Sequence, residues 1–220
     1  MRIRDCYLLI LILLTLNVPA QASPWYPIES GRIWTYSSTA GGPTTAVMQD
    51  PESFDGSLLQ PLLWTSGTRE YFSLDEFDRV LFHGAAFSDG SFIVFDPPIV
   101  RMDPELMLGH EWETQTVSIL YDHSGIEVRR VQARSSYRVI AVGSVTVSAG
   151  TFPAAEILRT EETGFLPGSS FRDTYAEDIG WILRTDENAS SVLFELTGYG
   201  AHGVRTEISS WSAVKSRYGN

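Results

Sequence analysis

Cysteine is almost absent from this chain of 220 residues, which contains Cys6 and no other. Cys6 precedes the apolar run 7–16, so it is not placed to be the lipid-accepting cysteine of a processed lipoprotein. The rest of the chain cannot form a disulfide and must be held together by its core alone. A domain of this size buries about 70% of its unfolded surface, which is sufficient. The lack of disulfides favours a bacterial envelope protein over an animal secreted domain.

Basic residues are also scarce, with 16 Lys and Arg against 27 Asp and Glu and a net charge of −11. Residues 1–22 carry Arg2, Arg4 and Asp5, a net +1, so the chain that follows them carries −12. Non-specific binding to nucleic acid or to an anionic membrane surface needs a basic footprint. We therefore expect neither partner.

Motifs for catalysis and metal binding are missing too. No serine lies in a Gly-x-Ser-x-Gly elbow, and His110-Glu111 is not followed by a histidine at the spacing of zinc proteases. The remaining histidines are isolated in the sequence: His83, His123 and His202. Neighbouring carboxylates occur in three pairs that fit solvated turns: Asp75 with Asp78, Glu161 with Glu162, and Asp186 with Glu187. We predict no catalytic residue, metal site or cofactor.

The N-terminus has the layout of a secretory signal peptide. Arg2 and Arg4 precede the apolar run 7–16, and a small-x-small site follows at residues 20–22. We predict cleavage after Ala22 and a periplasmic or secreted location, with no integral membrane span after cleavage. The apolar run is short for a span of about 20 residues, although an uncleaved anchor is the alternative.

Period-2 alternation, which is typical of antiparallel strands, dominates the remaining chain. The clearest strand covers 127–142, with an apolar face through Val131, Tyr137 and Val139 and a basic face through its arginines. Because this segment exceeds the usual strand length, we expect it to be bent, bulged or part of a curved sheet.

Two hairpins are predicted in the second half of the chain. One pairs 145–147 with 152–163 around Ala149-Gly150, and the other pairs 181–183 with 191–196 across the turn 186–188. A last strand is expected over Val204, Thr206 and Ile208. In the first half we expect strands at 33–37, 44–48, 70–74, 80–83 and 92–95, and a helical turn from Asp103 to Gly109 capped by Asp103.

These elements indicate an all-β fold. We predict a single curved antiparallel sheet, as an open barrel or a sandwich of hairpins, with at most one or two short helical turns. No linker divides the chain, so we expect one domain over 23–212, followed by a polar tail over 213–220.

Four segments carry a resemblance to exported bacterial β-rich proteins of unknown function. Residues 25–36 resemble their "YPL..G..W.Y" start, 95–112 their "PP … G..W" segment, 145–154 their "V.VPAGTF.A" hairpin and 180–182 their "GvGlv" strand. The resemblance implies a curved sheet, loosely like the open barrels of periplasmic lipoprotein carriers, and supplies no catalytic residues. Ser148 departs from the pattern, because it replaces the usual proline, which should loosen the turn without abolishing it.

Two candidate ligand sites follow from the pattern. Arg130, Arg134 and Arg138 share one strand face and suit an anionic ligand, unless Glu156 and Glu162 on the partner strand neutralise them. The aromatic residues either line an apolar cavity or form the core. The ligand-binding candidates are Trp34, Tyr36, Trp112, Arg130, Arg134 and Arg138.

The favoured function is therefore a non-enzymatic binding or carrier module of the bacterial envelope, for a lipid, an acyl chain or a lipoprotein. The alternative is a structural or interaction protein of the cell surface. A hydrolase acting on an envelope polymer is a third hypothesis, which needs carboxylates or histidines that converge in a cleft.

Overall fold

The structure is a computed structural model that describes residues 25–39, 41–165 and 167–201. The predicted signal peptide 1–22, the strand over Val204 to Ile208 and the tail 213–220 lie outside these residues. The domain boundaries therefore stay a prediction.

Thirteen strands and no helix form the described part of the chain. They are β1 (Arg32–Ser38), β2 (Thr44–Met48), β3 (Glu52–Phe54), β4 (Ser57–Trp64), β5 (Arg69–Leu74), β6 (Val80–Ala86), β7 (Phe92–Met102), β8 (Glu111–Tyr121), β9 (Glu127–Val147), β10 (Gly150–Thr163), β11 (Ser169–Ala176), β12 (Gly180–Asp186) and β13 (Val192–Ala201). The predicted all-β antiparallel class is confirmed.

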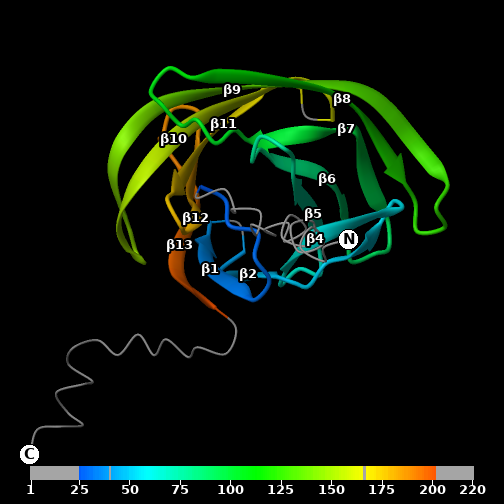
Figure 1. Cartoon of the computed structure of the whole chain (residues 1–220), viewed down its shortest axis with the longest axis horizontal. Coiled ribbons are helices and arrows are strands. Elements are labelled where there is room, and N and C mark those ends of the chain that lie inside the picture. Colours follow the sequence, from blue (N-terminus) through cyan, green and yellow to red (C-terminus); the bar gives the residue numbers. More distant parts are fainter. Residues whose placement is uncertain (1–24, 40, 166, 202–220) are drawn as a thin grey trace, which may run out of the picture.

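The sheet closes on itself into a barrel. From β4 to β13 each strand pairs antiparallel with the next, β13 pairs with β1, and β1 with β2. The ring closes where Ala46, Val47 and Met48 of β2 pair with Trp64, Leu63 and Leu62 of β4. β3 pairs with β4 outside the ring. The open barrel or sandwich that was predicted is thus a closed barrel, and Figure 1 shows the strands arranged in a ring.

The predicted hairpin at Ala149-Gly150 is present, and its strands β9 and β10 are the longest in the described chain. As expected, β9 is irregular, because the β9–β10 register shifts between Glu156 and Ile157. The hairpin tip reaches β13, where the Ala149 N–H donates to the Leu196 carbonyl over 3.1 Å.

Ser148 stabilises this contact. Its N–H and its hydroxyl both donate to the Glu195 carboxylate, at 2.6 and 2.7 Å. A proline at this position would have no N–H to donate. The departure from the resembling pattern therefore gives the turn a partner on β13.

The helical turn predicted from Asp103 to Gly109 is wrong, because this segment is a loop. Asp103 does accept a hydrogen bond from the Glu105 N–H, as a cap would, over 3.0 Å. Apart from the hydrogen bond from the His110 N–H to the Met107 carbonyl, the loop's later backbone groups pair with β9. The Gly109 N–H donates to the Val139 carbonyl and the Val139 N–H to the His110 carbonyl, both over 2.9 Å. Pairing with a neighbouring strand thus replaces helical hydrogen bonds.

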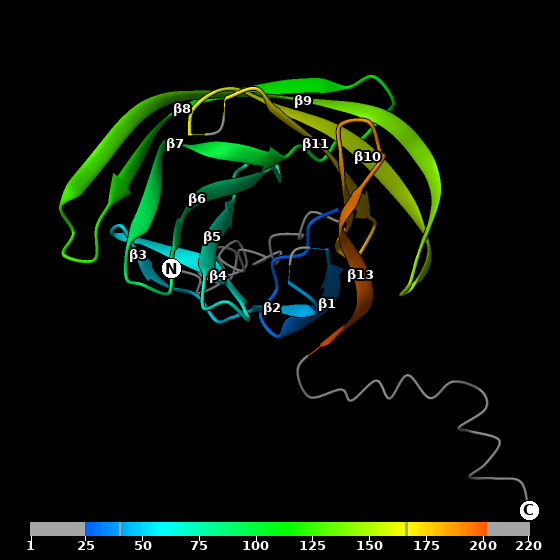
Figure 2. The ribbon, with the colours of Figure 1, turned by 180° about the vertical axis from the view of Figure 1, so that it is seen from behind.

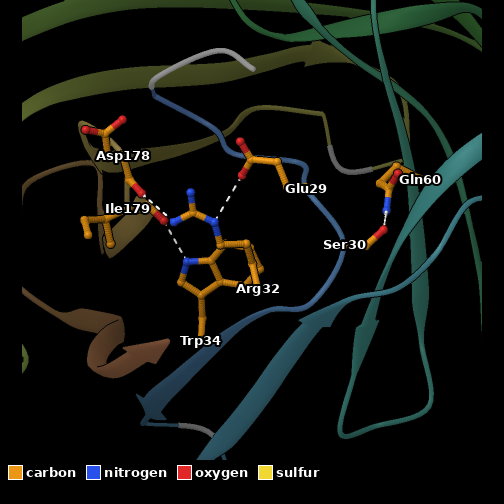
Figure 3. Close-up of polar contacts among 7 residues, drawn as sticks. All are labelled: Glu29, Ser30, Arg32, Trp34, Gln60, Asp178 and Ile179. Atoms are coloured by element: carbon orange, nitrogen blue, oxygen red, sulfur yellow. Dashed lines mark hydrogen bonds and ion pairs between the residues drawn. The ribbon is translucent and has the colours of Figure 1, made fainter. Parts of the chain in front are cut away.

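Residues 25–31, which precede β1, lie inside the ring (Figure 2), and Pro27 lies beside Gly180 at the β11–β12 turn. The Tyr26 ring is buried between Phe72 and Tyr175, with ring centroids 5.2 and 6.0 Å away. Figure 3 shows how β1 is joined to the β11–β12 turn: the Trp34 indole N–H donates to the Ile179 carbonyl over 2.7 Å. Arg32 donates to the Asp178 carbonyl over 3.1 Å.

Candidate functional site in the barrel lumen

A cavity of about 600 Å³ lies inside the barrel. Its rim is formed by the β1–β2 turn at 41–44 and the β4–β5 turn at 65–68. Because strand direction alternates, this is the end opposite the β11–β12 turn. Aromatic walls come from Tyr26, Trp64, Trp181 and Phe194. We call this space the mouth cavity.

A second cavity, of about 290 Å³, adjoins the first. The two share Glu70, Arg101 and Arg184 as lining residues. We call the second space the deep cavity. Its lining combines apolar side chains with hydroxyl and charged groups: Phe72, Phe82, Ile93, Phe95, Ile99, Ala133 and Phe165; Ser118, Ser135, Tyr137, Arg159 and Glu161.

Arg184, at the junction of the cavities, is held by Asp173. The guanidinium donates two hydrogen bonds to the Asp173 carboxylate, at 2.6 and 2.9 Å. It also lies over the Trp181 and Phe171 rings, 4.7 and 5.4 Å from their centroids. Burial alone would raise the pKa of Asp173, but the charge and hydrogen bonds of Arg184 outweigh it and lower that pKa. The pair is therefore ionised and fixed in orientation.

Arg159 and Arg101 are much less compensated. The nearest ion pair of Arg159 is with Glu161, at 3.6 Å, and its buried Nε has no hydrogen-bond partner. Burial and the neighbouring charge of Arg101 lower the pKa of Arg159. Arg101 lines both cavities, and no carboxylate of the described residues lies within ion-pair distance of it. The lumen thus contains cationic hydrogen-bond donors with free capacity.

Of the aromatic residues predicted as ligand-binding, Trp34 and Tyr36 lie in the packed wall, whereas Trp112 lines a separate pocket of about 380 Å³ together with Arg138. Trp34 and Tyr36 are buried, and Tyr36 donates from its hydroxyl to the Trp181 carbonyl over 3.0 Å. Both border a void of only about 20 Å³. Trp112 stacks on Tyr137 with ring centroids 5.0 Å apart and donates to the Val100 carbonyl. None of the three lines the mouth or the deep cavity, and their role in binding stays a prediction.

The predicted arginine stripe lies on exposed positions of β9, each with a carboxylate partner. Arg130 pairs with Glu127 at 2.8 Å, and Arg138 with Glu111 at 3.3 Å. Arg134 contacts Glu113 and Glu162, at 2.5 and 3.3 Å. Glu162 is thus a partner as expected, whereas Glu156 pairs with Arg172 on β11. The stripe's charge is largely neutralised.

Sequence reasoning missed Arg101, Arg159, Asp173 and Arg184. The sequence of β10 and β11 did contain a signal. Charged residues stand there at every-second positions whose other members have inward-facing side chains. Asp173, for example, stands between Phe171 and Tyr175 at intervals of two. A charged residue at such a position points into the barrel.

Residues 25–201, apart from positions 40 and 166, contain neither a cluster of metal ligands nor a membrane-spanning helix. No group of three or more His, Cys, Asp or Glu side chains there is placed to hold a metal ion. In the same range, the chain has no helix with the length and apolar character to cross a bilayer. His202, one of the predicted isolated histidines, lies outside it.

Fold and site together define a closed antiparallel barrel with a partly charged lumen. No protein-family model matches the chain, and no curated protein sequence does so significantly. Two solved structures are similar. One, provisionally described as a lipoprotein from Parabacteroides distasonis, is 13% identical with a TM-score of 0.38, over 82% of this chain and 100% of that one.

The other is provisionally described as an exported protein with a YmcC-like fold, from Bacteroides fragilis. It is 12% identical with a TM-score of 0.44, over 80% of this chain and 98% of that one. Both values lie below the similarity from which a shared fold or function follows.

Proposed function

We propose that this protein is an exported, non-enzymatic binding or carrier module of the bacterial envelope, which holds a lipid or acyl chain in its barrel lumen. The observation that carries the proposal is the pair of adjoining cavities, of about 600 and 290 Å³, behind a rim of two turns. Ligand pockets in proteins commonly have volumes of about 300–1,000 Å³ and apolar walls with a few polar groups. Trp64, Trp181 and Phe194 supply such walls in the mouth cavity.

Export is supported by the N-terminal sequence, with its basic start, apolar run and small-x-small site. The chain after that site contains no cysteine, so its core must be stable without disulfides. A core of this size is large enough for that. A periplasmic or secreted protein with aromatic walls in its lumen suits the transport of a poorly soluble molecule through water.

Native mass spectrometry of the protein, purified gently from its own envelope fraction, tests this proposal. We expect a non-covalent adduct of lipid mass that is lost on mild collisional activation. A clean mass of the apo chain from several gentle preparations would contradict a carrier with a resident ligand.

A second candidate, a surface interaction protein, is favoured by exposed apolar side chains at one end of the barrel. Phe77, in the β5–β6 turn, is 62% exposed, and Met107 and Leu108, in the β7–β8 loop, are 65% and 71% exposed. Alternating strand direction places these two loops at the same end. Crosslinking in intact cells, with a photoreactive residue at position 107 or 108, would capture a protein partner if this function holds.

A further inference from the structure

We propose that the lumen recognises an anionic amphiphile, with its carboxylate or phosphate head at Arg101 and Arg159 and its apolar tail in the mouth cavity. This inference rests on the proposed carrier function and adds the chemical class of the ligand. It starts from a difference among Arg101, Arg159 and Arg184, of which Arg184 alone has a close carboxylate counterion among the described residues.

Arg184 has its counterion in Asp173, whose side chain is 3% exposed and accepts both hydrogen bonds. Arg159 has one distant contact with Glu161 and an unpartnered Nε. Arg101 has no ion pair within the described residues. Burial alone would lower the pKa of Arg101, but the attraction of Tyr175 and Asp173 outweighs it and raises that pKa. Enclosed charges without partners are costly, so an arginine of this kind is stabilised by a bound anion.

The groups around Arg101 suit one anionic head. Guanidinium donors fit carboxylate and phosphate oxygens in a bidentate manner. Ser118, Ser135 and Tyr137 line the same deep cavity and carry hydroxyl groups. The carboxylates that line the cavities are Glu70 and Glu161. The negative charges of these two side chains would repel a polyanion, so the site suits a ligand with a small negative charge.

Apolar side chains line both cavities, and the larger volume of the mouth cavity sets the direction of the tail. The mouth cavity is the larger of the two and has Trp64, Trp181 and Phe194 on its walls. It adjoins the deep cavity at Arg101 and Arg184. A head bound at Arg101 and Arg159 therefore leaves the tail beside the aromatic side chains, directed towards the rim turns.

Isothermal titration calorimetry on the mature chain tests the charge requirement with three probes of equal tail length: dodecanoate, dodecyl phosphate and dodecan-1-ol. We expect at least one of the two anions to bind about tenfold or more tightly than the alcohol, since hydrogen bonds to charged groups are strong. The tighter of the two anions identifies the head group as carboxylate or phosphate.

Variants assign the effect to residues. R101Q and R159Q should each remove most of the advantage of the anion and leave dodecan-1-ol binding unchanged. R79Q, in the β5–β6 turn at the end of the barrel opposite the mouth cavity, is the control and should bind like the parent protein. If R101Q does not fold, as judged by its thermal transition, R101K replaces it and should lose part of the advantage, because it retains charge without the guanidinium fork.

The outcomes separate the two proposals. Equal affinity for dodecanoate, dodecyl phosphate and dodecan-1-ol would overturn the anionic head and leave the carrier function standing. An advantage of the anion that survives in both R101Q and R159Q would also overturn the inference. Absence of binding for all three probes would contradict the carrier function itself.

Discussion

Asp173 on β11 and Arg184 on β12 form a bidentate ion pair inside the barrel, with N–O distances of 2.6 and 2.9 Å. The two strands are neighbours, and the two residues are direct cross-strand partners. The Asp173 side chain is 3% exposed and that of Arg184 is 17% exposed, so the pair contributes to the fold in a way that the exposed ion pairs of β9 do not.

Removing the Asp173 charge should destabilise the protein. In D173N the enclosed Arg184 guanidinium loses its counterion, and breaking a buried pair from one side costs about 3–5 kcal/mol. Urea unfolding followed by tryptophan fluorescence measures the change. E111Q, which breaks the exposed pair with Arg138, serves as the control and should leave the midpoint unchanged. Equal midpoints for D173N and the parent protein would contradict this account of the pair.

The same pair predicts a pH dependence. The charge of Arg184 lowers the pKa of Asp173 in the folded protein, below its unfolded value of about 3.9. Its contribution is therefore fully present above that unfolded pKa and is lost as pH falls through the lower, folded pKa. We expect the difference in unfolding free energy between the parent protein and D173N to be largest near neutral pH and to shrink below about pH 4. A difference that stays constant between pH 7 and pH 3 would show that ionisation of Asp173 is not its source.

Gly84 should tolerate no side chain. A Cβ at this position would lie 2.1 Å from the Ile93 carbonyl oxygen and 3.1 Å from the Phe54 ring. Since the first clash is with backbone, we expect G84A to lower the unfolding free energy by about 3 kcal/mol, at the upper end of overpacking effects. Gly143 on β9 offers a control, because a Cβ there meets no atom within 4 Å. G143A should match the parent protein or exceed it slightly in thermal stability, and a loss as large as that of G84A would refute the steric explanation.

Substitutions at Trp34 and Phe194 should distinguish a residue that stabilises the fold from one that binds ligand. Trp34→Phe removes the hydrogen bond to the Ile179 carbonyl and should cost about 1–3 kcal/mol of stability, with little effect on ligand affinity. Phe194→Ala removes a wall of the mouth cavity and should weaken dodecanoate more than octanoate. Denaturation and calorimetry on both variants give the comparison. If Trp34→Phe weakens the binding free energy by more than it lowers the unfolding free energy, the role first predicted for Trp34 is correct and the lumenal site is misplaced.

Much of the fold was predictable because its signals are local. Gly150 opens β10 opposite Val147, where the turn at Ala149-Gly150 was expected, and β12 pairs with β13 across the predicted turn. β4 was missed, because its sequence contains Pro61, which is unusual inside a strand, and its apolar residues do not alternate. Closure of the ring depends on the pairing of Val47 with Leu63, which is set by curvature accumulated over the whole sheet. No local pattern carries that information.

The site was less predictable than the fold. The stripe of Arg130, Arg134 and Arg138 was conspicuous because alternation puts all three on one face. Each of these arginines, however, already forms an ion pair with an exposed carboxylate. Arg101 follows two prolines in β7, where bends in the strand hide the phase of the alternation. Whether a charged side chain faces the lumen depends on the register shifts of the strands, which only the assembled sheet shows.

Photolabelling with a dodecanoate that carries a diazirine at the end of its tail tests the central claim most directly. After irradiation and proteolysis, we expect the label on residues 64–68 or 181–194, which contribute to the mouth cavity, and weaker labelling when unmodified dodecanoate competes. Labelling confined to the exposed face of β9 or to the loop 104–109, or insensitive to the competitor, would contradict a ligand site in the lumen.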